Sequence, residues 1–320
     1  DPATGLLKKP GGENFSAVFG NTLAAMAAEN DRVCAVTAAM ADGTGLTGFA
    51  REFPERFFDV AIAEGHAVAM AAGLAKQGMI PVLAVYSTFL QRGYDMLIHD
   101  VALQRLHVVL GVDRAGLVGP DGETHQGCFD TLFLSEIPGF TLLCPANFAE
   151  MRSMLRQAVL EIGGPVAVRY PRGGQGDFQE DTSAEPVVCL RQGSDVTLLA
   201  YGLMVNSILG AAELLRRERK IDARVLKLNR IAPLDMELLE PWFQGGEVLA
   251  VPEDAFGAGC VGQRVAAILA EHGKAPGKLI LKNLGKTFAP EGSVAQLEHS
   301  FGLDAAGIAA AVWEAVGHEQ

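Results

Sequence analysis

The sequence predicts an α/β protein of two domains, each built on a mainly parallel sheet. The chain has 320 residues, of which 49% are hydrophobic and 20% are charged, and this is enough for two globular cores. Apolar runs rich in β-branched residues alternate with helical patterns, which is typical of parallel strands joined by helices. A polar, glycine-containing stretch at 173–186 separates two such sets and has the composition of an inter-domain linker.

The first set of elements covers the N-terminal part of the chain. Its expected strands lack the polar alternation of half-exposed strands, which indicates burial on both faces. The expected strands are 33–38, 80–86, 107–112, 141–146 and 166–170, and the expected helices are 16–30, 66–78 and 148–161. We expect this domain to span 13–174, after a linker at 1–12.

The second set follows a linker that we place at 175–193. Its expected strands are 195–202, 223–229, 247–253 and 278–285, and its expected helices are 205–219, a short one near 235–242, and 261–272. The second domain is predicted to span 194–320.

Composition excludes several classes of partner. The net charge of −12 argues against nucleic acid or an anionic membrane surface as the main partner. No apolar run approaches the roughly 20 residues that cross a bilayer, and the first residues have no apolar signal segment. The five scattered cysteines suggest reduced thiols in a cytoplasmic protein. Because the first residue is Asp, we expect a processed, cleaved or truncated chain.

The stretch FFDVAIAEGHAVAMAAGLA (57–75) places an acid, Glu64, at the start of an apolar helix. One interpretation is a helix-start carboxylate, favoured by unpaired backbone N–H groups. The other is a carboxyl group in an apolar wall, where burial raises its pKa and lets it share a proton with a ligand nitrogen. The stretch follows a predicted strand, and ligands bind at the carboxyl ends of parallel strands.

Two more stretches follow predicted strands. YSTFLQRGYD (86–95) either begins a helix with aromatic core contacts or offers a stacking surface, Phe89 or Tyr86, beside an anion-binding Arg92. DRAGLVGPDGETHQGCFD (113–130) is a long, charged, glycine-rich loop. Ordering such a loop is costly unless it contacts a ligand, although surface turns are the alternative.

The stretch VRYPRGG (168–174) ends the last strand of the first domain with two arginines. Either Arg169 or Arg172 is placed to complete a phosphate clamp with Arg92. No serine nucleophile elbow, Walker A loop, GxGxxG fingerprint or HExxH motif occurs in the sequence.

Taken together, these motifs resemble the 1-deoxy-D-xylulose-5-phosphate synthase family of thiamine-diphosphate enzymes. The resemblance rests on TAAMADGTGL, the three stretches above, AVRYPRG, RIAPLD and APEGSVAQLEHSFGLDAAGIA, and it extends over nearly the whole chain. It implies a thiamine-diphosphate pyrimidine-binding fold followed by a transketolase C-terminal domain. That family has a further N-terminal domain, which holds the diphosphate and Mg²⁺. This sequence has no GDG…N stretch of that kind, so we expect the metal ligands in a missing N-terminal half.

The resemblance also implies a reaction and roles. The family condenses pyruvate with glyceraldehyde 3-phosphate and releases carbon dioxide. Glu64 would hydrogen-bond the pyrimidine nitrogen of the cofactor and promote loss of the thiazolium proton, and Phe89 would stack on the pyrimidine. His125 would lie near the reacting oxygens. The residues implied around the phosphorylated acceptor are Tyr86, Arg92, Asp121, His125 and Arg172.

One position departs from the family pattern, and two other functions compete. The family has Gln where this chain has Gly65, and glycine costs about 1 kcal/mol inside a helix.

A separate C-terminal subunit of a two-chain transketolase-like or 2-oxo acid dehydrogenase enzyme is the first alternative function. A non-catalytic binding protein is the second, against which the joint presence of Glu64, Arg92, His125 and Arg172 argues. We expect a homodimer that is inactive without the N-terminal half.

Overall fold

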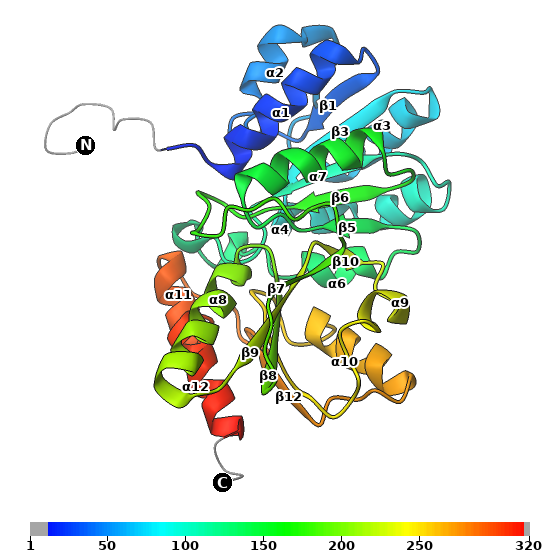
Figure 1. The fold of residues 1–320 in the computed structure, drawn as a ribbon. Coiled ribbons are helices and arrows are strands. Elements are labelled where there is room, and N and C mark those ends of the chain that lie inside the picture. The colour runs from blue at the N-terminus through cyan, green and yellow to red at the C-terminus, as the bar shows by residue number, and fades with distance from the viewer. Residues whose placement is uncertain (1–11, 317–320) are drawn as a thin grey trace, which may run out of the picture.

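The computed structural model describes residues 12–316, so residues 1–11 of the predicted linker at 1–12 lie outside the described part of the chain. Two sheets with helices on both faces are arranged one after the other (Figure 1). The larger sheet has seven strands in the order β10-β5-β6-β4-β3-β1-β2, and the smaller has five in the order β12-β11-β8-β9-β7. No helix of the described residues is long and apolar enough to cross a membrane.

The larger sheet is parallel except for β10, which pairs antiparallel with β5. Its strands are β1 (Val33–Thr37), β2 (Phe57–Asp59), β3 (Ile80–Tyr86), β4 (Val109–Asp113), β5 (Thr141–Leu143), β6 (Val166–Arg169) and β10 (Arg230–Ala232). Its helices are α1 (Phe15–Glu29), α2 (Thr47–Glu52), α3 (Glu64–Lys76), α4 (Ser87–Leu90), α5 (Tyr94–Met96), α6 (Asp130–Ser135) and α7 (Phe148–Leu160).

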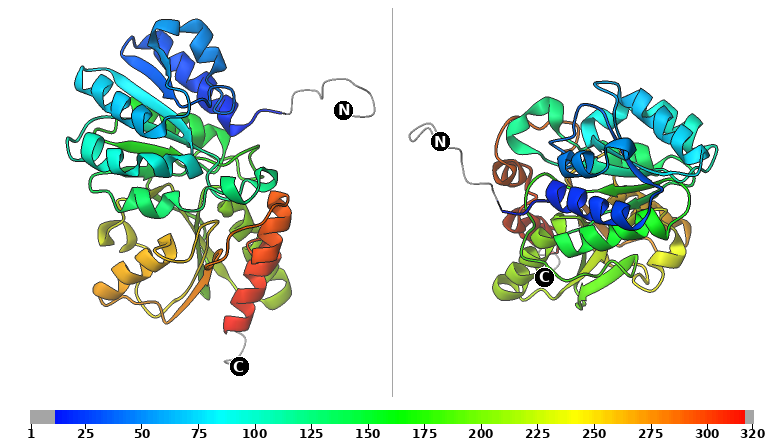
Figure 2. Two further views of the ribbon diagram at one scale, coloured as in Figure 1. Left: turned by 180° about the vertical axis from the view of Figure 1, so that it is seen from behind. Right: turned by 90° about the horizontal axis from the view of Figure 1, so that it is seen from above.

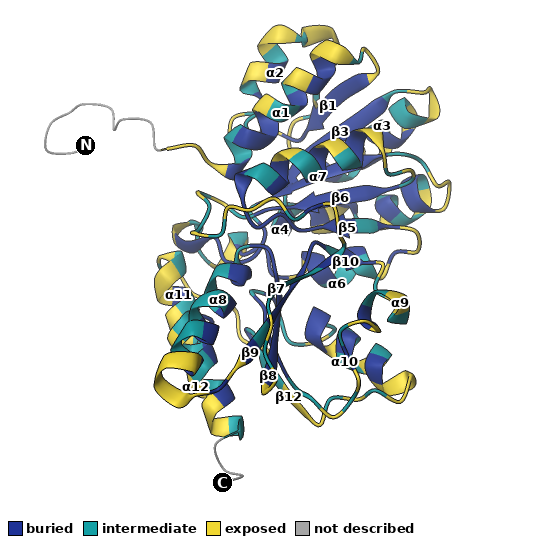
Figure 3. Ribbon diagram, viewed as in Figure 1, coloured by how far each residue is buried: buried dark blue, intermediate teal, exposed yellow. Residues whose placement is uncertain are grey.

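The central strands of this sheet have side chains buried on both faces, as their unbroken apolar sequences require. In β3, Val82 and Ala84 pack with α1 and α7, whereas Leu83 and Val85 pack with α3 and the segment after β3. The view from behind in Figure 2 shows the helices of 64–102 on that second face. The central strands are dark blue in Figure 3, and the outward sides of the helices are yellow.

The smaller sheet is parallel apart from β7, which pairs antiparallel with β9. Its strands are β7 (Val187–Arg191), β8 (Val196–Tyr201), β9 (Ala223–Leu228), β11 (Val248–Pro252) and β12 (Lys278–Lys282). Its helices are α8 (Met204–Leu214), α9 (Met236–Leu239), α10 (Val261–Glu271), α11 (Val294–Phe301) and α12 (Ala305–Val316). Helices α8 and α12 cover one face and α10 the other.

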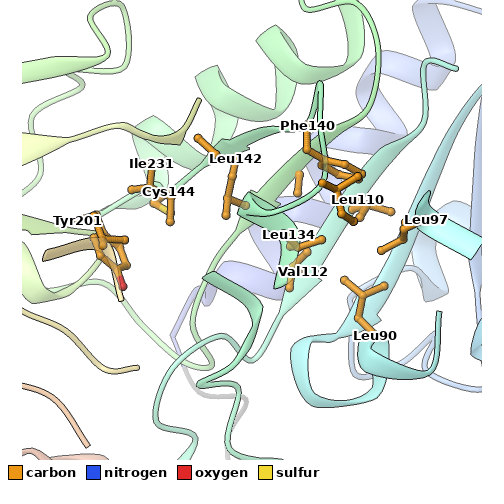
Figure 4. Packing of buried hydrophobic residues seen from close by; sticks show 14 of the residues in the cluster. Leu90, Leu97, Leu110, Val112, Leu134, Phe140, Leu142, Cys144, Tyr201 and Ile231 are labelled. Atoms are coloured by element: carbon orange, nitrogen blue, oxygen red, sulfur yellow. The ribbon is translucent and has the colours of Figure 1, made fainter. Parts of the chain in front are cut away.

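A single apolar cluster continues from one sheet into the other (Figure 4). It runs from Leu110 and Val112 of β4 through Cys144 to Ile231 of β10 and Tyr201 of β8. All five side chains are buried. The two sheets are therefore packed through a shared core.

The predicted fold class is confirmed, since both sheets are mainly parallel and alternate with helices. The linker predicted at 175–193 is wrong in its last part, because Val187–Arg191 forms β7. This strand, VVCLR, is short, mostly half-buried and at the edge of the smaller sheet, and it directly follows a polar stretch. The strand predicted at 107–112 begins two residues later, since both ring nitrogens of His107 contact carbonyl oxygens of Val159 and Gly164.

Candidate active site

Three residues with left-handed backbone mark the carboxyl edge of the larger sheet. Ala39 follows β1, Ala61 follows β2 and Arg114 directly follows β4, with φ angles of 59°, 58° and 58°. Residues with a side chain rarely adopt this conformation, and strained positions of this kind gather at functional sites. Ligands of open α/β sheets also bind at this edge. The backbone thus points to the edge that the sequence motifs indicate.

Glu64 is the first residue of α3, and its side chain is 4% exposed. Nη1 of Arg92 donates a hydrogen bond of 2.6 Å to its Oε1. Its Oε2 accepts no hydrogen bond from any residue of 12–316 and is available to a ligand. One of the two interpretations of the sequence placed this carboxylate in an apolar wall. In the structure, the segment after β3 brings a guanidinium to it.

Two glycines allow the segment that carries Arg92 to lie against α3. A Cβ on Gly65 would lie 2.6 Å from Cε of Met96, and a Cβ on Gly93 would lie 2.7 Å from Cγ2 of Val68. Gly65, the position that departs from the family pattern, is therefore a close-packing position in this chain. A glutamine there would require the end of Met96 to move.

Phe89 lies at the centre of an aromatic cluster. Its ring stacks on Tyr86 with 5.8 Å between centroids and meets His125 edge-on at 5.3 Å. The guanidinium carbon of Arg92 lies 5.2 Å from the Phe89 centroid. Through these contacts and the ion pair with Arg92, Glu64 joins the same cluster. The structure therefore brings together five of the predicted site residues.

The loop between β4 and α6 is closed at its neck. Gly116 and Gly127 form an antiparallel bridge, with two N–H···O bonds of 2.8 Å. Beyond the neck, two short 3₁₀ turns, Gly119–Asp121 and Glu123–His125, each end in a predicted site residue. Nδ1 of the histidine lies 2.9 Å from Oγ1 of Thr124. The neck and turns give this glycine-rich loop a defined conformation.

Asp121 connects two arginines. Its Oδ1 accepts a 2.6 Å hydrogen bond from Nη1 of Arg172, and its Oδ2 lies 3.9 Å from Nε of Arg114. The guanidinium carbon of Arg114 lies 3.8 Å from the ring centroid of Tyr86. Burial raises the pKa of Tyr86, an effect that Arg114 opposes. Arg114 therefore links the Phe89 cluster to Asp121. In the sequence, Arg114 directly follows a predicted strand, which is the signal that could have identified it as a site residue.

Arg169 is the candidate that the structure rejects. It is 4% exposed, and its Nε donates to both carboxylate oxygens of Asp130, at 3.0 and 2.9 Å. Its Nη2 lies 3.4 Å from Oδ1 of Asp254 in the second half of the chain. Arg172 is 39% exposed and lies at the surface. Arg92 and Arg172 pair with different carboxylates, those of Glu64 and Asp121.

Comparisons with known proteins match both halves of the chain. Residues 13–175 match the family described as transketolase, pyrimidine binding domain, and residues 186–308 match transketolase, C-terminal domain. The chain is 46% identical to 1-deoxy-D-xylulose-5-phosphate synthase 1 of Geobacter sulfurreducens, over 97% of this chain and 50% of the relative. It is 45% identical to the synthase of Thiobacillus denitrificans, over 98% of this chain and 50% of that relative.

The chain thus spans about half the length of the curated relatives it matches. Among solved structures it resembles a split-gene transketolase in an inactive β4 tetramer. The TM-score is 0.81 at 29% identity, and the match covers 97% of this chain and 100% of that one.

Proposed function

The chain belongs to the transketolase pyrimidine-binding domain family, and from this premise we propose that it forms the C-terminal half of a 1-deoxy-D-xylulose-5-phosphate synthase. The proposed reaction condenses pyruvate with glyceraldehyde 3-phosphate and releases carbon dioxide. Its support is the similarity to named synthases along almost the whole chain, together with the cluster around Phe89.

The buried carboxylate of Glu64 is the observation that carries the proposal. Its Oε2 is available, and Phe89, which contacts the same Arg92, offers an aromatic ring; these two groups fit the aminopyrimidine of thiamine diphosphate. When bound, that cofactor supplies a nucleophilic carbon and an electron sink. Glu64 would hold a proton between Oε2 and the ring nitrogen, while Arg92 fixes the carboxylate through Oε1.

The neighbouring polar residues fit a phosphorylated acceptor. Arg172 is exposed enough to bind phosphate, and Asp121 holds its guanidinium in place. Arg92 is 59% exposed, so nitrogens other than the one on Glu64 can face the acceptor. Tyr86 and His125 flank Phe89, which would place His125 near the reacting oxygens.

The diphosphate and Mg²⁺ require a second half. Within residues 12–316, no group of three or more His, Cys, Asp or Glu side chains is arranged to hold a metal ion. We place the metal ligands in a diphosphate-binding half, attached or separate, and we propose a cytoplasmic homodimer of the complete enzyme. The split-gene transketolase, whose matched chain has this same extent, supports the need for such a half.

Substitution of Glu64 tests the proposal. In the enzyme completed with the diphosphate-binding half, we expect Glu64→Ala to lower kcat at least 10³-fold, which corresponds to about 4 kcal/mol of barrier. The measurement is formation of 1-deoxy-D-xylulose 5-phosphate, with circular dichroism to show that the fold is kept. An exposed acid, Glu55, gives the control Glu55→Ala, which should leave kcat unchanged. Turnover of Glu64→Ala within tenfold of wild type would refute the role proposed for Glu64 in catalysis.

A further inference from the structure

We propose that Asp113 is a positioning residue of the acceptor site, which acts by holding Arg114 against Tyr86 and toward Asp121. The inference rests on the proposed function, because Tyr86 and Asp121 are placed there as acceptor residues. Asp113 does not itself reach the site. Its effect passes through the guanidinium of Arg114.

Asp113 ends β4 with its side chain fully buried. Its Oδ2 accepts a 2.7 Å hydrogen bond from Oγ of Ser16 on α1, and its Oδ1 accepts a 3.1 Å bond from Nη1 of Arg114. The left-handed backbone of Arg114, with φ of 58°, turns its side chain back onto the preceding residue. A carboxylate buried among apolar strands is thus held between one hydroxyl and one guanidinium.

Arg114 in turn contacts three parts of the site. Its Nη1 also donates to the carbonyl of Gly43 at 2.8 Å, and its guanidinium carbon lies 3.8 Å from the Tyr86 centroid. A Cβ on Gly43 would lie only 1.7 Å from the Tyr86 hydroxyl, so the tyrosine is confined between Gly43 and Arg114. With a side chain 13% exposed, the guanidinium is poorly solvated, which strengthens its attraction to the ring. Its Nε faces Asp121.

The charge of Asp113 governs this arrangement. Burial raises the pKa of Asp113 to about 6, while Arg114 and the hydroxyl of Ser16 lower it. Tyr170, which directly follows β6, packs nearby, and burial and the charge of Asp113 both raise the pKa of that tyrosine. Protonation of Asp113 near pH 6 removes one charge of this ion pair, and the bond that Arg114 then donates to a neutral carboxyl is weaker. Acceptor binding should weaken as the pH falls through this value.

Protonation of Asp113 affects stability in the opposite direction to acceptor binding. The pKa of Asp113 is raised in the folded chain above its ordinary value of 3.8, so between those values the folded state binds more protons than the unfolded state. This group therefore favours folding below pH 4, and that contribution is lost as the pH rises through about 6. A purely structural Asp113 would change stability with pH and leave acceptor binding unchanged.

The test uses Asp113→Asn in the enzyme completed with its diphosphate-binding half. We expect the KM for glyceraldehyde 3-phosphate to rise about tenfold at pH 7.5. The KM for pyruvate and kcat should stay within about threefold of wild type. The fall in acceptor affinity near pH 6 should become smaller than in wild type, and the part that remains is due to the substrate phosphate, whose second pKa is also about 6. The matched control is Asp222→Asn, at an exposed aspartate whose carboxylate accepts no hydrogen bond from the described residues.

A second variant keeps the inference testable if Asp113→Asn does not fold. Ser16→Ala removes a hydrogen bond that favours the charged carboxylate, so the midpoint of the pH effect should move upward. A folded Asp113→Asn with wild-type acceptor KM at every pH, or a crystal structure of it with Arg114 still seated on Tyr86, overturns the inference and leaves the proposed function standing. A wild-type enzyme without synthase activity overturns the proposed function itself.

Discussion

Arg169 and Arg172 lie three residues apart, and their surroundings give them different tasks. Arg169 is buried, and its Nε donates to both carboxylate oxygens of Asp130, whereas Arg172 is partly exposed and bound to Asp121. Removing one partner of a buried ion pair leaves an uncompensated buried charge. Removing one partner of an exposed pair leaves a charge that water can solvate. Substituting each arginine in turn therefore distinguishes an effect on stability from an effect on substrate binding.

We expect Arg172→Ala to raise the KM for glyceraldehyde 3-phosphate by roughly ten- to hundredfold, since a charge-assisted contact contributes about 1.5–3 kcal/mol. Pyruvate binding and stability should change little. Arg169→Ala should instead lower the free energy of unfolding by about 3–5 kcal/mol. Steady-state kinetics with phosphorylated and unphosphorylated aldehydes and urea unfolding check both. Equal losses for the two aldehydes in Arg172→Ala would show that this arginine does not bind the phosphate.

Individual site residues were predictable where they follow strands. Tyr86 and Phe89 became candidates this way, because the apolar run before them is visible in sequence and strand ends meet at one edge. Glu64 became a candidate because it is an acid at the start of an apolar helix. The contacts between these side chains were not predictable from the sequence. That Arg92 contacts Glu64, and that Arg114 rests on Tyr86, depends on how segments distant in sequence pack.

At the scale of elements, the packing of α3 against the segment after β3 depends on two glycines with different neighbours. Gly65 faces the flexible end of Met96, whereas Gly93 faces Cγ2 of the fully buried Val68. A flexible thioether moves easily, but a branched side chain in a packed core does not. A larger side chain should thus fit at position 65 with little loss of stability and should destabilise the protein at position 93.

We expect Gly65→Ala to change the free energy of unfolding by no more than a gain of about 1 kcal/mol, because alanine favours the helix. Gly93→Ala should lose about 1–3 kcal/mol through overpacking. Urea unfolding of the two variants beside wild type makes the comparison. A larger loss in Gly65→Ala than in Gly93→Ala would contradict the packing described for this helix.

The elements that sequence patterns missed share one cause. β2, β7 and β10 lie at sheet edges and are short or partly exposed, so they lack the long apolar runs of central strands. The segment 87–102 is helical but broken by a 3₁₀ turn and a π-helical turn, Leu97–Ala102, and its periodicity is correspondingly blurred. Central strands, in contrast, were placed within two residues of where they begin.

At the scale of the whole molecule, the two halves of the chain are built as one body. β10 comes from the C-terminal half of the sequence but pairs with β5 in the first sheet. The shared apolar cluster, and the contact of Arg169 with Asp254, join the same two halves. The described residues of the two halves therefore share one packed core, and the proposed site at the carboxyl edge would offer only one wall to a cofactor.

This one-sided site leads to the last prediction, which concerns the chain as given. Glu64 and Phe89 supply one hydrogen-bonding group and one aromatic face. These two contacts cannot offset the entropy lost in fixing a flexible, highly charged cofactor. We therefore expect residues 1–320 to fold and self-associate, yet to show no synthase activity and no Mg²⁺-dependent binding of thiamine diphosphate in the micromolar range.

Calorimetric titration of the isolated chain with thiamine diphosphate and Mg²⁺ measures this directly, and light scattering on the same sample shows that the chain is folded and assembled. Addition of the diphosphate-binding half should restore both binding and turnover, because the two walls then enclose the cofactor. The Glu64→Ala variant, treated in the same way, should regain much less turnover. Tight, metal-dependent binding by the chain alone would mean that its own residues hold a diphosphate, and the need for a second half would then be refuted.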